Sequence, residues 1–276
     1  MIAVQWYDPE LNKIIHNGPI LVHSVFEHAI NLVNQHTMMT LVSSSKPKAP
    51  LTWVCDLDSF SKHHVKHGIT CHVLNEQLHI GELVIQLNTC PTQSLDRISD
   101  KFNASNDVIK GCESLLSWSI SQPIYEGAMG LFHEHEDIMS IYCVKKLKAY
   151  LSSFDIQWFK EFIGCGHGLT PSGDDVLTGM MAMAHAFNHQ GFVHVVSKLC
   201  EPQLSKTTDV SQVMLKHAFN GRFNDYQSKL IQAISVNKDV HDFANQCSTL
   251  GHTSGYDFMV GVLMYYFMIK KGATYA

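Results

Sequence analysis

Short apolar and β-branched runs, separated by residues that favour turns, follow one another through roughly the first hundred residues. Runs of this kind predict β-strands, and we expect strands at residues 19–26, 38–42 and 51–55. Two further runs, at residues 71–74 and 82–87, predict a hairpin that turns through the residues between them. The N-terminal part is therefore expected to be rich in β-structure.

Beyond about residue 103 the apolar positions recur with the spacing of an α-helix. Amphipathic helices are predicted at residues 107–118, 138–151 and 157–163. One more helical face, which ends near Gly221, is formed by Val210, Val213, Met214, Ala218 and Phe219.

Two segments, residues 174–189 and 256–270, are apolar on nearly every side, which is typical of buried helices. The pattern as a whole predicts an α+β protein. We expect a β-rich region, residues 1–102, packed on a mostly helical region, residues 103–276, that contains two buried helices of equivalent design.

The charge balance excludes two large classes of partner. The 276 residues carry a formal net charge of -5, so nothing predicts binding to nucleic acid or to an anionic membrane. Arginine occurs only at positions 97 and 222. Because arginine is the side chain that best grips phosphate or carboxylate groups, anion binding is expected to fall to main-chain amides and lysines.

Eight cysteines are dispersed along the chain, and no two have the Cys-x-x-Cys spacing of a zinc ribbon or a redox motif. The first residues lack the basic start and apolar core of a signal peptide, and no apolar run reaches the length of a membrane span. Free thiols without a signal predict a cytoplasmic protein.

A short motif occurs twice. Residues 168–179 read Gly-Leu-Thr-Pro-Ser-Gly-Asp-Asp-Val-Leu-Thr-Gly, and residues 251–261 read Gly-His-Thr-Ser-Gly-Tyr-Asp-Phe-Met-Val-Gly. With Pro171 as an insertion, the Gly, Thr, Ser, Gly, Asp and final Gly positions coincide. Each copy has the Ser-x-x-Asp form of a capping box and precedes an apolar run, so each predicts the N-terminus of a helix.

The structural interpretation of the motif is a helix cap. Either Thr170 caps the helix with Pro171 at its first position, or Ser172 forms a capping box with Asp175, an arrangement that the second copy repeats. The carboxylate at position 175 would then satisfy a main-chain amide, and the adjacent Asp174 would be available for a ligand.

The functional interpretation is a ligand site between two helix ends, and we favour it. Gly166, Gly168 and Gly173 suit a backbone that approaches a ligand closely, and Asp174 adds a carboxylate that a cap does not need. Duplication indicates two equivalent half-sites. Two helix N-termini that face one cleft attract a small, partly anionic ligand.

Residues 205–211 lie between the two copies and are dense in hydroxyl groups. They predict either a third helix cap or a third wall of the same site, with Lys206 as its cation and Thr207 and Thr208 as its hydroxyls.

Residues 168–175, 207–211 and 251–257 resemble a family that includes the H component of the bacterial oxamate carbamoyltransferase. The similarity extends over most of the chain, since Asn31-Leu32 and the following strand also fit, although more weakly. The family loop usually reads Gly-Leu-Gly-Pro-Gly, where this chain has Gly-Cys-Gly-His-Gly at residues 164–168. This departure leaves the substrate open.

The resemblance implies a role in late purine or allantoin breakdown, where oxalurate and phosphate give oxamate and carbamoyl phosphate, and it implies other subunits of a carbamoyltransferase complex. A small carbamoyl or ureido ligand fits the residues, because helix ends suit its oxygens and carboxylates accept from its N–H groups. The expected catalytic residues are Asp174, Asp175, Asp257 and His252. The expected ligand-binding residues are Gly168, Thr170, Ser172, Gly173, Lys206, Thr207, Thr208, Thr253, Ser254 and Gly255.

Two other functions stay open. The same three aspartates with His252 could surround one divalent ion in a metal-dependent hydrolase, or the motifs could only brace a non-catalytic subunit. The histidine-rich segments 133–136 and 63–67 are expected to be solvated surface, because chance clusters are common in a chain with 18 histidines. Cys165 with His167 as base is a weaker nucleophile hypothesis, and no cofactor is predicted.

Overall fold

The computed structural model describes residues 1–35, 37–87, 90, 94, 95, 98, 102, 106–133 and 137–272. The chain divides into two compact units, Met1–Asp96 and Arg97–Ala276. The first is β-rich and the second mostly helical, which confirms the predicted α+β class.

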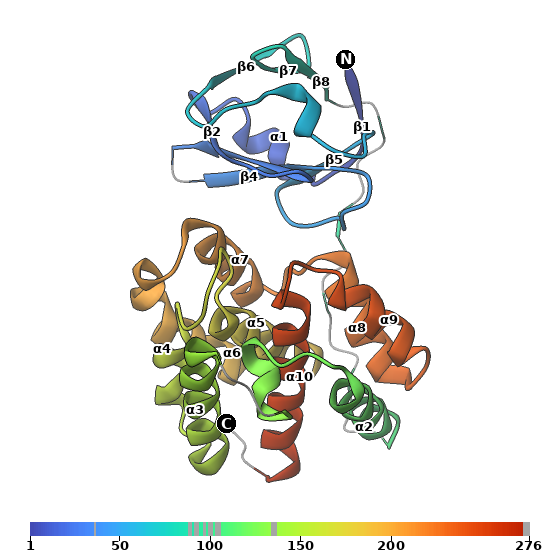
Figure 1. Ribbon diagram of the computed structural model, residues 1–276, viewed down its shortest axis with the longest axis vertical. Coiled ribbons are helices and arrows are strands. Elements are labelled where there is room, and N and C mark those ends of the chain that lie inside the picture. The colour runs from blue at the N-terminus through green and yellow to red at the C-terminus, as the bar shows by residue number, and fades with distance from the viewer. Residues whose placement is uncertain are drawn as a thin grey trace. The chain divides into compact units, whose positions relative to one another are not determined.

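The N-terminal unit is a closed eight-stranded barrel with the strand order β1-β5-β4-β3-β2-β6-β7-β8 (Figure 1). Most neighbours are antiparallel, whereas β4 with β5 and β1 with β8 are parallel, and the latter pair closes the barrel. The strands are β1 (Ile2–Tyr7), β2 (Ile20–Val25), β3 (Ala29–Asn34), β4 (Thr37–Val42), β5 (Thr52–Cys55), β6 (Thr70–Leu74), β7 (Gln77–Ile80) and β8 (Leu83–Gln86). Alternate side chains of these strands fill the interior, together with Leu11 of the short helix α1 (Leu11–Ile14).

The three strands expected from separate apolar runs are present as β2, β4 and β5. The predicted hairpin is wrong, because β7 lies between its two arms: β6 pairs with β7, and β7 pairs with β8. The positive φ angles of Asn75 and Glu76 allow the chain to turn directly after β6. A tight turn and a four-residue strand therefore occupy the segment that the pattern predicts as one loop.

The C-terminal unit contains nine α-helices in its described residues. They are α2 (Asn106–Ser121), α3 (Ile138–Ser153), α4 (Phe159–Phe162), α5 (Ser172–Ala186), α6 (Gln190–Cys200), α7 (Asp209–Phe219), α8 (Asp225–Val236), α9 (Val240–Ser248) and α10 (Ser254–Lys270). Short 3-10 turns are η2 (Gly127–Leu131), η3 (Ile156–Trp158) and η4 (Glu201–Lys206). The helix predicted at 157–163 is divided between η3 and α4.

Helices α5 and α10 form the centre of this unit (Figure 1). Every residue of α5 except His185 is buried, and so is most of α10, as their uniformly apolar sequences predict. The remaining helices pack around this pair and contribute to one continuous apolar core.

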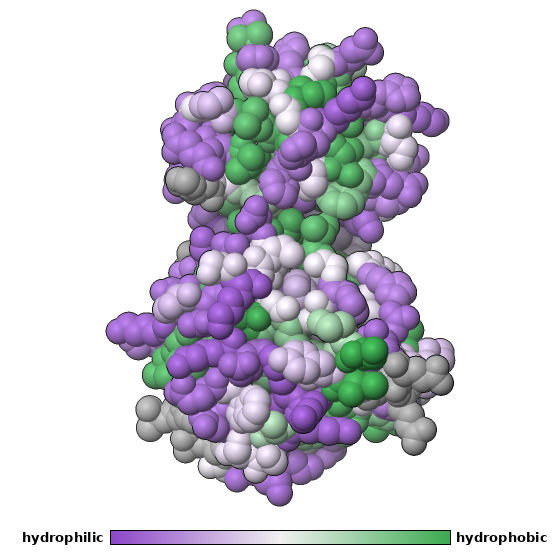
Figure 2. All heavy atoms as spheres, turned by 60° about the vertical axis from the view of Figure 1, so that its left-hand side comes forward, coloured by the Kyte–Doolittle hydropathy of each residue, from purple (hydrophilic) through white to green (hydrophobic). Residues whose placement is uncertain are grey.

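Hydrophilic side chains are prominent over the face of the molecule that Figure 2 shows, with smaller apolar groups between them. Within the described residues, no helix combines the length and the apolar character that crossing a membrane requires.

Candidate functional site

The two copies of the motif meet in space, as their duplication predicts. The hydroxyls of Thr170 and Ser254 lie 2.6 Å apart where α5 and α10 begin. A Cβ on Gly179 would come within 2.0 Å of the Phe258 carbonyl oxygen. A Cβ on Gly261 would meet the carbonyl of Val176 at the same distance, so the contact repeats with two-fold equivalence. Each glycine therefore permits close approach of the two helices.

The expected capping boxes are wrong in both copies. Helix α5 starts at Ser172 with Pro171 in the N-cap position, and α10 starts at Ser254 with Thr253 in that position. Neither start has a side-chain capping hydrogen bond. The serines stand one position inside their helices, so their hydroxyls are available for partners across the helix pair.

Asp174 is fixed by its surroundings. Its Oδ1 accepts a hydrogen bond from the main-chain N–H of Gly164 at 2.9 Å. Its Oδ2 accepts from the hydroxyl of Thr207 at 2.5 Å and from that of Ser211 at 2.7 Å. Burial raises the pKa of Asp174, and the same three bonds act in the opposite direction. This carboxylate ties α5 to the loop after α4 and to the start of α7.

Asp175 and Asp257 each lie beside hydroxyl groups from both motifs. The hydroxyls of Thr170 in the same motif and of Ser254 in the other act to lower the pKa of Asp175 on α5, so both lie beside its carboxyl group. In the same way, the hydroxyls of Thr253 in the same motif and of Ser172 in the other lie beside the carboxyl group of Asp257 on α10 and act to lower its pKa. The relative exposure of the two aspartates is 2% and 0%. The helix ends therefore form one interleaved polar centre inside the apolar core.

Both of these carboxyl groups have raised pKa values. Burial raises the pKa of Asp257 to about 6, although its hydrogen bonds favour the charged form. Burial raises the pKa of Asp175 well above its usual range, and the charge of Asp257 raises it further. Oδ2 of each aspartate is buried and accepts no hydrogen bond. The centre therefore holds two carboxyl groups that the surrounding protein leaves incompletely paired.

The turn η2 forms a further side of this centre, which sequence reasoning missed. The main-chain N–H of Ala128 donates to Asp257 Oδ1 at 2.6 Å. Gly127 has φ +62°, and a Cβ there would lie 2.5 Å from the same oxygen. The Gly127 N–H in turn donates to Ser140 of α3 at 2.8 Å. Nothing in the local sequence marks this segment, because its partner lies 129 residues away.

Thr208 is the N-cap of α7, which confirms the simpler interpretation of residues 205–211. Its hydroxyl accepts from the N–H of Ser211 at 3.1 Å and also donates to the carbonyl of Leu169. Lys206 ends η4 with an exposed side chain. These contacts bring the third segment against the glycine-containing loop before α5.

The predicted glycines and His252 differ in their exposure to solvent. Gly168 is exposed in the loop, whereas Gly173 and Gly255 are buried in the first turns of α5 and α10. His252 is exposed, and its Nδ1 lies 3.3 Å from Glu126 Oε2, so the ring faces an acidic surface residue. No group of three or more His, Cys, Asp or Glu side chains in the described residues is arranged to hold a metal ion.

Two other candidate clusters are Cys165 with His167 and the histidine-rich segment at 133–136. Cys165 is buried, whereas His167 is exposed and its Nε2 lies 3.6 Å from Asp137 Oδ1. The histidine therefore pairs with an acid and not with the thiol for which it was the expected base. In the histidine-rich segment at 133–136, residues 134–136 fall outside the described residues.

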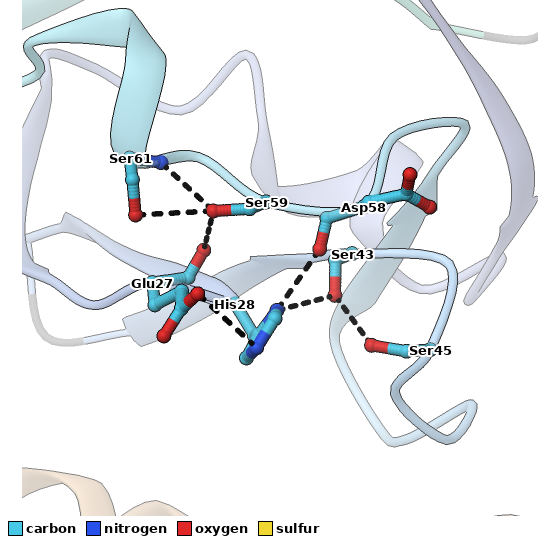
Figure 3. A network of polar contacts seen from close by, with 7 residues as sticks. All are labelled: Glu27, His28, Ser43, Ser45, Asp58, Ser59 and Ser61. Carbon is cyan, nitrogen blue, oxygen red and sulfur yellow. Dashed lines mark hydrogen bonds and ion pairs between the residues drawn. The ribbon is translucent and has the colours of Figure 1, made fainter.

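A polar network in the barrel unit resembles a nucleophile, base and acid set (Figure 3). His28 Nδ1 lies 3.3 Å from Ser43 Oγ, and His28 Nε2 lies 3.8 Å from a carboxylate oxygen of Glu27. However, the same Nδ1 is 2.9 Å from the carbonyl oxygen of Asp58, which can only accept. Nδ1 therefore carries a proton and cannot take one from Ser43. The network fastens the loops at this end of the barrel.

Residues 162–266 match the family described as oxamate carbamoyltransferase subunit AllH, and residues 4–92 match the AllH family N-terminal domain. No solved structure matches the chain. The first match contains both copies of the motif and the three aspartates, and the second covers most of the barrel unit. Since the two matches span most of the sequence, the chain belongs to the AllH family, which is described as a subunit of oxamate carbamoyltransferase.

Proposed function

We propose that this protein acts in the transfer of a carbamoyl group between oxamate and phosphate, and binds a carbamoyl or ureido ligand where the two motifs meet. The reaction is oxalurate and phosphate to oxamate and carbamoyl phosphate, a late step of purine or allantoin breakdown in the cytoplasm. The observation that carries the proposal is the junction of Thr170 with Ser254, inside the region that matches the transferase subunit.

The anionic end of such a ligand finds donors at this junction. The main-chain N–H groups of residues 166–170 and 251–253 make no hydrogen bond within the described part of the chain. They lie in exposed or half-buried loops that lead directly into α5 and α10. Helix N-termini carry partial positive charge and favour carboxylate or phosphate oxygens. The exposed Lys206, in η4, supplies a full positive charge.

The amide end of the ligand needs acceptors. Both oxygens of Asp174 are already occupied, so this carboxylate positions the loop instead of contacting the ligand. The hydroxyl oxygens of Thr170 and Ser254 lie nearer the surface and supply acceptors for carbamoyl N–H groups. A ligand with both an anionic group and amide hydrogens therefore satisfies more of the junction than phosphate or urea alone.

The metal-dependent hydrolase is less well supported. It requires Asp174 and His252 beside the other two aspartates, but Asp174 is saturated by three donors and His252 is exposed against Glu126. The alternative that the motifs only brace a non-catalytic subunit is tested by the same experiment as the proposal. Other subunits of the enzyme are expected to complete the active site.

The test combines ligand binding with reconstituted transfer. Oxalurate and carbamoyl phosphate should raise the melting temperature of this chain more than phosphate or urea does. A ligand at one hundred times its dissociation constant adds about 2.7 kcal/mol of stability, which is readily detected. Together with the other subunits, the chain should be required for oxamate-dependent release of phosphate from carbamoyl phosphate.

Lys206→Gln should weaken both readouts, whereas Lys198→Gln, at an exposed lysine of α6, should leave them unchanged. Transfer that proceeds at the full rate without this chain would refute the proposal. Transfer that needs the chain but survives Lys206→Gln and Ser254→Ala unaltered would identify it as a bracing subunit.

A further inference from the structure

Two carboxylate oxygens inside the helical unit lack a partner. Oδ2 of Asp175 and Oδ2 of Asp257 are buried, and neither accepts a hydrogen bond. In the described part of the chain, neither aspartate forms an ion pair with lysine, arginine or histidine. An unpaired buried carboxylate is costly, because transfer out of water removes its hydration and nothing replaces it.

The side chains beside these two aspartates carry hydroxyl oxygens. Each carboxyl group faces two hydroxyls, one from its own motif and one from the other, and these belong to Thr170, Ser254, Thr253 and Ser172. The thiols of Cys247 and Cys143 are softer groups near the centre. Burial and Asp175 raise the pKa of Cys247. The thiol of Cys165, burial and Asp257 raise the pKa of Cys143. A thiol that keeps its proton is a poor metal ligand, so the available donors are hard oxygens.

The amount of negative charge distinguishes between ligands. Two adjacent carboxylates repel an anion, and they repel each other. Burial raises the pKa of Asp175, and the charge of Asp257 raises it further. A ureido group is too large to reach side chains with almost no exposed surface unless the helices separate. A single divalent ion is small enough, carries two positive charges, and prefers carboxylate and other oxygen ligands.

We propose that Asp175 and Asp257 hold one divalent cation of the magnesium or calcium class between the first turns of α5 and α10, with the four surrounding hydroxyls as further oxygen donors. The ion compensates the paired carboxylates and joins the two motifs electrostatically. The ion borders the site proposed for the carbamoyl ligand, because the hydroxyls of Thr170 and Ser254 lie between the two, whereas the two carboxylates belong to the ion alone.

Metal content and metal-dependent stability test the proposal. Protein purified without chelator should contain about one divalent ion per chain by inductively coupled plasma mass spectrometry. After chelator treatment, Mg²⁺, Ca²⁺ or Mn²⁺ should raise the melting temperature, whereas Na⁺ at matched ionic strength should not. Wild-type protein that carries no divalent ion and shows no shift with any of the three would overturn the proposal.

Asp175→Asn and Asp257→Asn should each weaken the affinity by at least about 100-fold, more than changes outside the ligand shell do. Asp242→Asn, at an exposed aspartate in the first turn of α9, should bind as the wild type does. Should an asparagine variant fail to fold, Ser172→Ala and Thr253→Val keep both charges and should weaken binding about 10-fold. A shift of unchanged size in these variants would place the ion elsewhere and refute the assignment.

A wild-type chain that binds the ion but supports no carbamoyl transfer with the other subunits would refute only the proposed function. A wild-type chain that supports carbamoyl transfer but binds no divalent ion would refute only the proposed cation site.

Discussion

Gly179 lies against the main chain of Phe258 so closely that a Cβ would stand 2.0 Å from the carbonyl oxygen. The relationship is repeated with the roles of the helices exchanged, since Gly261 lies against Val176 in the same way. Backbone atoms cannot give way as a flexible side chain can. This crossing therefore fixes the distance between the two helices and, with it, the spacing of the polar centre at their N-terminal ends.

We expect Gly179→Ala to force the helices apart and to destabilise the protein by about 1–3 kcal/mol or more, the range for overpacked cores. Urea unfolding followed by circular dichroism measures this. The control is Gly191→Ala, at an exposed position in α6, which should be neutral or slightly stabilising because alanine favours helix. Equal stability of the two variants would show that the crossing tolerates a methyl group.

We expect Asp174→Asn to destabilise the protein by about 1–3 kcal/mol, because asparagine cannot accept all three hydrogen bonds that this carboxylate receives. In chelator-treated protein, Asp175→Asn should cost less, since it removes a buried charge that repels Asp257. Chemical unfolding in the presence of chelator compares the two. The reverse order would mean that Asp175 is the better satisfied of the pair.

Gly127→Ala is expected to destabilise the helical unit through a clash with Asp257. The residue combines a positive φ with a Cβ position 2.5 Å from a carboxylate oxygen. Gly81→Ala separates the two effects, because Gly81 has φ +59° but no atom within 4 Å of its Cβ position. Strain alone should cost roughly 1 kcal/mol at either site. A melting temperature no lower for Gly127→Ala than for Gly81→Ala would contradict the clash.

Acidification should weaken the contact between His189 and Tyr265. The His189 Nδ1 lies 2.6 Å from the Tyr265 hydroxyl, whose raised pKa keeps it protonated, so the neutral imidazole accepts this proton. Burial lowers the pKa of His189. The unfolded chain therefore binds more protons, and the stabilisation present at higher pH is lost as the pH falls below about 6.5.

Melting curves between about pH 8 and pH 5 should show a smaller loss for His189→Phe than for the wild type, over the range where histidine titrates. The phenylalanine keeps the ring that stacks on Phe187. His16→Gln, at an exposed histidine, serves as the control and should behave as the wild type does. The effect is small because His189 is partly exposed to solvent.

Repetition in the sequence was sufficient to predict that residues 168–179 and 251–261 meet, because equivalent glycines indicate equivalent contacts. It was not sufficient to assign the aspartates. Asp174 and Asp175 are chemically identical neighbours, and their roles depend on which side of α5 faces Thr207. That direction follows from where the helix begins. The helix starts at Ser172 with Pro171 in the N-cap position, whereas the sequence predicts Thr170 or Ser172 as the cap.

In the fold, too, elements with a clear local pattern were predicted, whereas an element that depends on partners distant in the sequence was missed. Uniformly apolar segments identified α5 and α10, whereas strand β3 was missed although it pairs along its length with β2 and β4. It carries Asn31, a residue type that is depleted in strands. Its side chain bonds to Ser24 and Thr40 of the neighbouring strands, so the polar group is satisfied by partners that no local pattern reveals.

The interleaved centre also bears on the order in which the protein can be completed during synthesis. Helix α5 is buried almost throughout, yet the helix that covers it begins 82 residues later in the chain. At ribosomal rates of about 5–20 residues per second, roughly 4–16 seconds pass before that covering segment is made. During this interval α5 exposes apolar surface, and its Asp175 lacks the Ser254 hydroxyl of the second motif. Chaperone contact is therefore expected to concentrate on nascent chains that end between the two motifs.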